Sequence, residues 1–368
     1  MYKLKEGKIS SHGLFNIVVI LLLTKLFLGI PRALVIEAGS AGWLLILMSA
    51  IVAGVGIFVL TKLLKRFPGK NIVEISELVW GVPGRVFTSL IIFLLFLYIS
   101  TVVVREFAET MLTTVLPGTP ISIIILTFVV TMIFGAYKGI EVITRSAVLL
   151  FPFIAVGILS ILFLTANFIN LNNLFPIFGE GLTKIAYHAP GKSSIFIDII
   201  FIGLIASSVS DFENIPRQLW KGFFISVVMF VLVQVVYISV MNVSAGEKLY
   251  IPLYHLAKII YMGRFVQRIE ALYIFVWFFS GALQLTISLY GAAVSLSTGF
   301  KIPIFQPLLF PLGLLVFSLS FIPSGILAAV YLDINALREY GAIPGWGIPL
   351  ALLLTSFIRK KGGACPEK

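Results

Sequence analysis

Five ionisable side chains lie inside stretches of the chain that are otherwise almost entirely apolar. They are Lys25, Arg105, Glu106, Glu109 and Asp198. A charge at the centre of a membrane helix costs about 2.5–3.5 kcal/mol on insertion scales, so such residues usually face an opposite charge or a wet cavity. Because both signs occur here, the pattern predicts buried ion pairs and places the functional site among these residues.

Arg105, Glu106 and Glu109 form the densest polar group. Arg105 and Glu109 are four residues apart, so on a helix they share one face and can neutralise each other. Two interpretations of this cluster stay open. It is either a structural pair that fixes helix packing, or a functional group that acts as a counter-ion for a ligand or as a coupling element between two conformations.

Lys25 differs from this cluster because no acidic residue lies within one helical turn of it. Its partner must come from another part of the chain, and Asp198, Glu106 and Glu270 are the candidates. A buried lysine without a partner would be a plausible proton site. The alternative is a lysine whose long side chain reaches the membrane interface.

The elements that must position these residues are membrane helices. Of the 368 residues, 59% are apolar and 12% are charged, and the mean hydropathy is +1.08. Apolar runs of about 20 residues match a hydrocarbon core about 30 Å thick. The predicted fold class is therefore an all-α polytopic membrane protein, with ten spans at about 13–36, 42–64, 86–115, 120–137, 143–165, 193–214, 221–243, 268–298, 304–322 and 344–358.

The stretch from Pro323 to Tyr340 contains Asp333, Arg338 and Glu339, and we expect it to be an amphipathic helix at the membrane interface. An eleventh span is the alternative, but it would move the basic tail around Arg359 to the outside. With ten spans, one set of loops carries about twice as many lysines and arginines as the other. By the positive-inside rule, both termini are expected in the cytoplasm.

Other function classes find little support. The net charge of +11 gathers beside the predicted spans, where anionic membrane lipids explain it, and nucleic acid is not an expected partner. Cys365 is the only cysteine and the three histidines are far apart in sequence, so we expect no disulfide within the chain, no metal site and no cofactor. No constellation of residues suggests an enzyme.

Ten helices divide into two sets of five, which forces opposite orientations and predicts an inverted repeat within a single transmembrane domain, 1–368. The repeats would cover about 13–165 and about 193–358. The first helix of each set is interrupted, by Gly29-Ile30-Pro31 and by Pro190-Gly191 upstream of Asp198. Breaks at corresponding positions point to a midplane binding site. An ordinary kink and a loop end are the alternatives, and 207–211 is a rival position for the second break.

Several stretches resemble the endospore germination permeases, the B subunits of the nutrient receptors of dormant bacterial spores. They are Ser10-Ser11, Gly29-Ile30-Pro31, Arg66-Phe67-Pro68-Gly69-Lys70, Arg105-Glu106-Phe107, Leu116-Pro117-Gly118-Thr119-Pro120, Gly139-Ile140-Glu141-Val142-Ile143-Thr144-Arg145, Ile348-Pro349 and Arg359-Lys360-Lys361. The resemblance covers essentially the whole chain. One departure is that Ser194-Ile195-Phe196-Ile197-Asp198 stands where the family often has a Phe-Pro-Phe-Gly-Glu-like stretch.

The resemblance implies an amino acid, polyamine and organocation transporter-like fold, with a ligand held between the broken first and sixth helices and lined by the third and eighth. It also implies a larger A subunit and a lipoprotein C subunit as partners, in the spore inner membrane or the bacterial cell membrane. The candidate ligand-binding residues are Thr24, Lys25, Phe27, Leu28, Gly29, Ile30, Pro31, Ser194, Phe196, Asp198 and Gln284.

We therefore expect a nutrient-sensing subunit that binds a small molecule, an amino acid, and signals by changing conformation. The exposed backbone around Leu28 to Pro31 and Ser194 to Asp198 would receive the ammonium and carboxylate groups of the ligand. Thr24 and Gln284 would add polar contacts, and Phe27 and Phe196 would shape the side-chain pocket. The main alternative is a proton-coupled amino-acid symporter of the same fold. A third class is an ion-conducting element of a receptor complex. Fold alone does not separate them.

Overall fold

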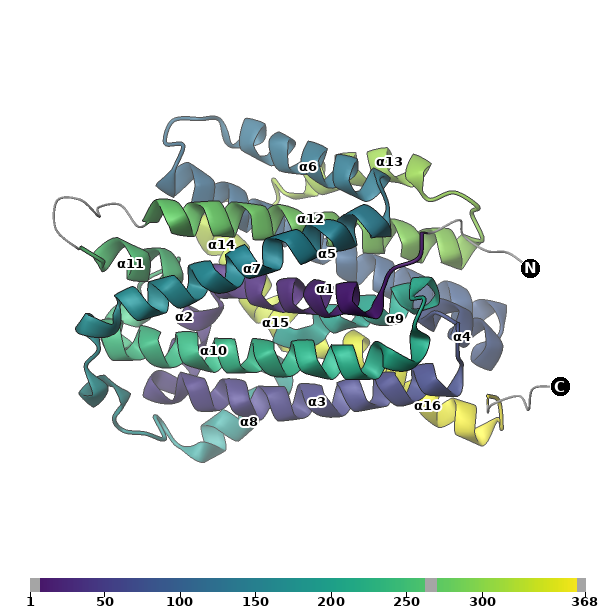
Figure 1. Ribbon diagram of the computed structural model, residues 1–368, viewed down its shortest axis with the longest axis horizontal. Helices are drawn as coiled ribbons and strands as arrows, with labels where there is room; N and C mark the ends of the chain where they lie inside the picture. Colours follow the sequence, from purple (N-terminus) through teal and green to yellow (C-terminus); the bar gives the residue numbers. More distant parts are fainter. Residues whose placement is uncertain (1–6, 262–269, 363–368) are drawn as a thin grey trace.

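The computed structural model describes residues 7–261 and 270–362, and this part of the chain forms one bundle of helices (Figure 1). The α-helices are α1 (Ser11–Leu23), α2 (Ile30–Ala38), α3 (Gly42–Arg66), α4 (Ile72–Trp80), α5 (Val82–Thr114), α6 (Ile121–Tyr137), α7 (Ile140–Leu164), α8 (Leu182–Lys192), α9 (Ile200–Ile205), α10 (Ile215–Gly246), α11 (Pro252–Ile259), α12 (Glu270–Phe300), α13 (Gln306–Leu319), α14 (Ile326–Tyr331), α15 (Arg338–Tyr340) and α16 (Ala342–Ile358).

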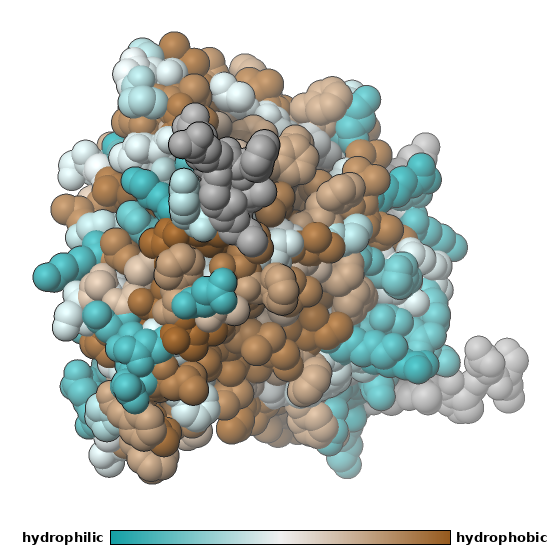
Figure 2. Space-filling model, turned by 60° about the vertical axis from the view of Figure 1, so that its left-hand side comes forward, coloured by the Kyte–Doolittle hydropathy of each residue, from teal (hydrophilic) through white to brown (hydrophobic). Residues whose placement is uncertain are grey.

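Seven helical stretches of the described residues are long and apolar enough to cross a membrane, and three shorter apolar stretches accompany them. Their order along the chain matches the ten expected spans, and the predicted all-α membrane fold is confirmed. Large apolar side chains such as Phe134 and Phe163 are exposed on the perimeter. In the view of Figure 2, hydrophobic residues cover the middle of the surface and hydrophilic ones gather toward its sides. This is the surface expected of a protein in lipid.

The first span is broken where the sequence predicted it. Ser10 caps the start of α1 through its side chain, and α1 tightens into the 3₁₀ turn η1 (Thr24–Phe27). Leu28 then adopts an extended backbone, and α2 begins anew with Pro31 in its first turn. Proline suits that position because its missing N–H would have no partner there. Every residue from 16 to 31 is buried, so the break lies at the centre of the bundle.

The sixth span differs from the prediction in position and form. It runs over Leu182–Ser208 rather than 193–214, because α8 is its first half and not a loop. Pro190 lies inside α8, and the interruption is the 3₁₀ segment η5 (Ser193–Ile199), which precedes α9. The alternative prediction of a break at 207–211 is wrong, because the span ends at Ser208. The carbonyl of Ser208 accepts a hydrogen bond from Ile9 N, before α1, at 2.9 Å.

The tenth span also differs. Residues 326–358 form one continuous helical stretch, so the segment expected to lie at the interface is the first half of a membrane helix. Its middle is the π-helical segment η8 (Leu332–Leu337), between α14 and α15. Asp333 and Arg338 are 1% and 0% exposed. The prediction failed because it treated these charges as solvated, whereas they pair with each other inside the protein.

The helices pack around α1, which contacts α10, α7 and η5, while the long helices α5 and α12 lie against each other over most of their length. The start of α1 and the end of α16 lie at the same end of the bundle, at the right of Figure 1. The segment α2 therefore leads from the central break toward the opposite end. Both interruptions, η5 of the sixth span and the α1–α2 junction of the first, contact the tenth span between Val330 and Arg338.

Candidate functional site

Lys25 and Asp198 form a fully buried ion pair between the two interrupted helices. Both side chains have no exposed surface, and the Lys25 ammonium also donates to the carbonyl oxygen of Ile195 in η5. The expectation that Lys25 finds its partner outside its own helix is confirmed, and of the three candidates it is Asp198. The pair fastens the 3₁₀ turn η1 to the 3₁₀ segment η5.

Arg338 extends this pair into a chain of four charges. Its Nη1 lies 3.8 Å from Asp198 Oδ2 and donates to the carbonyl of Ser194 at 3.1 Å, while its Nη2 lies 3.0 Å from Asp333 Oδ1. Asp333 and Arg338 are five residues apart, and the i to i+5 spacing of a π-helix brings such residues to one side. The tenth helix thereby holds the backbone of the sixth at its interruption.

Glu106 lies on α5 beside the break in the first helix. Its Oε1 accepts a hydrogen bond from the backbone N–H of Gly29 at 3.0 Å. Its other oxygen, Oε2, is buried and has no hydrogen-bond partner. Among the described residues, Glu106 has no ion pair within 4 Å. One oxygen of the carboxylate therefore satisfies a free amide at the start of α2, as an acid near a helix N-terminus does. The other oxygen makes no hydrogen bond.

Arg105 and Glu109 form the pair that their spacing predicted, with Arg105 Nη2 lying 2.7 Å from Glu109 Oε1. Arg105 Nη1 also donates to the carbonyl of Ser320, just past the end of α13, at 3.3 Å. This pair is separate from Glu106, which turns toward Gly29. The cluster of three residues thus divides into a pair that joins α5 to α13 and one acid at the helix break.

The other candidate residues are all buried, but they face different neighbours. Thr24 Oγ1 donates to the carbonyl of Ile20 at 2.7 Å, Pro31 O accepts from Gln234 Nε2 at 3.1 Å, and Leu28 and Ile30 belong to the apolar core. Phe27 packs edge-on against Tyr273, with centroids 5.7 Å apart.

Phe196 packs among aromatic rings, and the amide of Gln284 has no hydrogen-bond partner. The Phe196 ring packs against Phe223 and Phe230 of α10, at centroid distances of 5.1 and 5.8 Å. Gln284 is fully buried on α12, and both of its side-chain polar atoms lack hydrogen-bond partners. An unsatisfied buried amide is costly, and it signals a place where a ligand or water completes the bonding.

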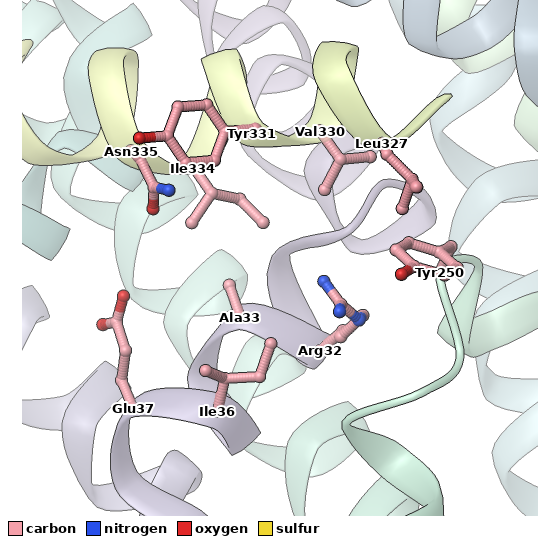
Figure 3. Close-up of a pocket in the computed structure, with 10 residues that line it drawn as sticks. All are labelled: Arg32, Ala33, Ile36, Glu37, Tyr250, Leu327, Val330, Tyr331, Ile334 and Asn335. Carbon is pink, nitrogen blue, oxygen red and sulfur yellow. The ribbon is translucent and has the colours of Figure 1, made fainter. Parts of the chain in front are cut away.

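A cavity of about 330 Å³ opens between α2 and the tenth helix, on the side of the break that leads away from the start of α1 (Figure 3). Its polar side chains are Arg32 and Glu37 of α2, Tyr250, which precedes α11, and Tyr331 and Asn335 of the tenth helix. Val330 and Ile334 point from the tenth helix toward α2. We call this cavity the vestibule, lined by Arg32, Ala33, Ile36, Glu37, Tyr250, Leu327, Val330, Tyr331, Ile334 and Asn335.

Val330 and Ile334 also reach the helix break. A methyl group added at Gly29 would lie 3.2 Å from Val330 Cγ1, 3.6 Å from Ile334 Cδ1 and 3.6 Å from Glu106 Oε1. These two side chains pack with Ala33 in a small cluster of their own. A single layer of aliphatic side chains therefore separates the vestibule from the break and from the carboxylate of Glu106.

A second group of charges lies beside the vestibule. Lys192 of α8 is 2.7 Å from Glu37 and 3.5 Å from Glu339, and His188 is 3.9 Å from Glu37. These contacts join the outer parts of the first, sixth and tenth helices. Sequence reasoning missed this group, together with Arg338 and Asp333, because α8 and the segment 326–340 were placed outside the membrane; the five-residue spacing of Asp333 and Arg338 was the available signal.

A bundle of membrane helices whose first and sixth members are interrupted side by side defines the class of transporter-fold proteins, and solved structures bear this out. The chain superposes on a nucleobase-cation-symport-1 family transporter in a closed conformation with bromovinylhydantoin bound, with a TM-score of 0.71 and 14% identity over 98% of this chain and 80% of that one. It also superposes on MhsT in complex with L-phenylalanine, with a TM-score of 0.66, 14% identity, and 96% and 90% of the two chains covered.

Sequence comparison places the chain more narrowly. It belongs to the spore germination protein family, whose model matches residues 8–326. It is 24% identical to spore germination protein KB of Bacillus subtilis (strain 168) over 324 residues, which cover 86% of this chain and 85% of that protein. It is 25% identical to spore germination protein A2 of the same organism, over 95% and 94% of the two chains. The family predicted from the motifs is confirmed.

Proposed function

We propose that this chain is the small-molecule-binding subunit of a spore germinant receptor. An amino acid enters through the vestibule, binds at the break between α1 and α2, and shifts the packing of the first, sixth and tenth helices. The observation that carries the proposal is that Val330 and Ile334 line the vestibule and lie against Gly29 and Glu106 at the break. A cavity of about 330 Å³ is at the lower end of the range for small-molecule sites.

Two further observations support this proposal. MhsT, which shares this fold, was solved with L-phenylalanine bound, and the matched relatives are spore germination proteins. Buried polar atoms without partners also occur at the two interruptions, on Glu106 and Ser194. In a membrane bundle such atoms are expensive to keep unless a ligand uses them.

Signalling in this proposal rests on differential affinity. A ligand that binds one packing of the helices about 10⁴-fold more tightly than the other supplies about 5.5 kcal/mol toward that packing. The charge chain from Lys25 to Asp333 joins three helices at one point, so a ligand that moves α2 changes the contacts of all three. We propose that an A subunit and a C-subunit lipoprotein read this change in the spore inner membrane, and that both termini of this chain face the cytoplasm.

The test is thermal unfolding of the purified full chain in detergent, against a panel of the twenty amino acids, sugars and nucleosides. A ligand at 100 times its Kd adds about 2.7 kcal/mol to the stability of the native state, which visibly raises the unfolding midpoint. We expect one or a few amino acids to raise it. A panel in which no amino acid raises the midpoint would contradict the proposal.

A matched pair of glycine variants locates the binding site. Gly29→Ala keeps an allowed backbone, since Gly29 has φ −70°, but adds a methyl group between Val330 and Glu106. We expect the ligand to bind about tenfold more weakly or worse, in line with the effect of one misplaced methyl group. Gly347→Ala adds its methyl group to open space and should bind as the unmodified chain does. Equal binding by both variants would place the site elsewhere.

A proton-coupled symporter remains the second candidate, and the specific observation in its favour is Glu106, a buried carboxylate without an ion pair that could carry a proton across. Proteoliposomes separate the two functions. A symporter accumulates a labelled amino acid that stabilises the chain, and it stops when the pH gradient is removed. A sensing subunit binds the same amino acid without accumulating it.

A further inference from the structure

The buried charges around the two interruptions do not balance. Lys25 and Arg338 are the cations, and Asp198 and Asp333 are the carboxylates that they contact. These four groups neutralise one another. Glu106 is 2% exposed and is left without a cation among the described residues. An ionised carboxylate inside a membrane bundle is strongly unfavourable without a compensating charge. Such a group is neutralised by a proton or by a cation, so a ligand cation can compensate the charge of Glu106.

The hydrogen bonds at the break indicate which part of a ligand fits there. The Gly29 amide, which starts α2, is where a ligand carboxylate would find a donor, but Glu106 Oε1 already accepts its hydrogen bond at 3.0 Å. The carbonyl oxygens of Ile195 and Ser194 in η5 are likewise taken, by Lys25 and Arg338. Three of the backbone groups expected from the sequence to hold an amino acid are thus occupied by the protein's own charged side chains.

One side-chain acceptor at the break has no partner. Glu106 Oε2 is buried and has no partner, and it belongs to the same carboxylate that holds Gly29. A positively charged donor would give this oxygen a hydrogen bond and would also compensate the charge of the carboxylate. A carboxylate brought to the same place would meet a like charge when Glu106 is ionised, and the Gly29 amide is already taken by Glu106.

A series of aromatic rings connects the backbone at Gly29 with the backbone at Glu106. Phe27, two residues before Gly29, packs on Tyr273, which stacks at 6.2 Å with Trp277; Trp277 stacks at 4.9 Å with Phe107, the residue after Glu106. All four rings are buried. The series is a buried aromatic contact that joins η1, α12 and α5 beside the break.

From these contacts we propose that Glu106 Oε2 is the acceptor for the protonated amine of the ligand, and that binding at the break does not require a ligand carboxylate. The ligand class is a small organic ammonium compound that reaches Glu106 past Val330 and Ile334. This inference rests on the proposed function, because it names the group that the binding site recognises.

Derivatives of the ligand test the inference on the unmodified chain. For each of the twenty amino acids, thermal unfolding in detergent is measured with the free amino acid, its amide and its N-acetyl form at equal concentration. The amide keeps the ammonium and loses the carboxylate charge, and the N-acetyl form does the reverse. We expect an amino acid that raises the midpoint and its amide to act alike, within about threefold in Kd, and the N-acetyl form to bind at least tenfold more weakly.

A charge-removing variant identifies the acceptor. Glu106→Gln retains an oxygen for the Gly29 amide, so the unliganded midpoint should be unchanged or higher, whereas the Kd for the amino acid and its amide should rise at least tenfold. Glu109→Gln removes a carboxylate from the same helix that contacts Arg105 instead, and its ligand preference should equal that of the unmodified chain.

The outcomes separate the inference from the function. An N-acetyl form that binds as well as the free amino acid, or an amide that does not bind, overturns the inference and leaves small-molecule binding in place. The same holds for a Glu106→Gln chain that binds normally. A panel without any stabilising compound overturns the inference and the proposed function together. If Glu106→Gln does not fold, the derivative series on the unmodified chain decides.

Discussion

At the scale of single residues, the organising feature is that charged side chains do the work that backbone groups do in a regular helix. Lys25 holds the carbonyl of Ile195, Arg338 holds that of Ser194, and Glu106 holds the amide of Gly29. The Arg105–Glu109 pair was predictable from charge and spacing, whereas the sequence left three candidate partners for Lys25, of which the structure selects Asp198. The separate role of Glu106 was not predictable, because its contact with Gly29 depends on how α5 packs against the break.

The Lys25–Asp198 pair makes a prediction about stability. Asp198→Asn leaves two buried cations, Lys25 and Arg338, with one carboxylate fewer, and breaking such a pair costs about 3–5 kcal/mol. Adding Lys25→Met removes the unpaired ammonium, so the double variant should be more stable than Asp198→Asn alone. Thermal midpoints in detergent measure this, and a double variant that unfolds below the single one would show that Lys25 stabilises the fold independently of Asp198.

His255, on the short helix α11 between two spans, makes a prediction about pH. Burial lowers the pKa of His255 below its ordinary value, and the charge of Lys258 lowers it further. The unfolded chain takes up this proton near pH 6.5, while the native state resists it, so this contribution to stability is complete above about pH 6.5 and falls as the pH drops toward the native pKa. His255→Gln should flatten the fall of the unfolding midpoint between about pH 7 and 5. An unchanged slope would contradict this assignment.

At the scale of elements, the sequence predicted the existence of the ten spans, but it placed the starts of the sixth and tenth too late. The predicted sixth span left out α8, and the charges of the segment 323–340 excluded that segment from the membrane. In the structure, Lys192 of α8 contacts Glu37 and Glu339, and Asp333 contacts Arg338. A paired charge does not carry the penalty that hydropathy counting assigns to a single one. No local sequence pattern predicted the π-helical form of η8 or the 3₁₀ form of η5, because tertiary contacts select these forms.

The packing of α5 against α12 makes a prediction that belongs to this scale. A methyl group added at Gly281 would lie 2.0 Å from Phe107 Cε1, and the Phe107 ring cannot turn aside because it contacts Trp277 and Phe128. Gly281→Ala should therefore destabilise the chain by about 1–3 kcal/mol. Gly347→Ala, which meets nothing within 4 Å, is the control and should be neutral or slightly stabilising. Equal midpoints for the two variants would show that the two helices can separate at little cost.

At the scale of the whole molecule, the vestibule and the charge chain lie on the same three helices. The first, sixth and tenth spans meet at Lys25, Asp198 and Arg338, and their outer parts meet again at Glu37, Lys192 and Glu339. The vestibule lies between α2 and the tenth span. Closure over a ligand therefore needs only a movement of α2 toward that span, while the α5–α12 core stays fixed.

This geometry predicts that a ligand protects the vestibule from solvent. Asn335 is exposed and lines the vestibule, so Asn335→Cys, made with Cys365→Ser, should react with a maleimide that does not cross membranes. An amino acid that raises the unfolding midpoint should slow this reaction at least fivefold. Asn172→Cys, exposed in the connection between the fifth and sixth spans, should react at the same rate with and without ligand. Ligand binding that leaves the Asn335→Cys rate unchanged would mean that α2 does not close, and signalling would then have to pass from η5 to the partner subunits without movement at the vestibule.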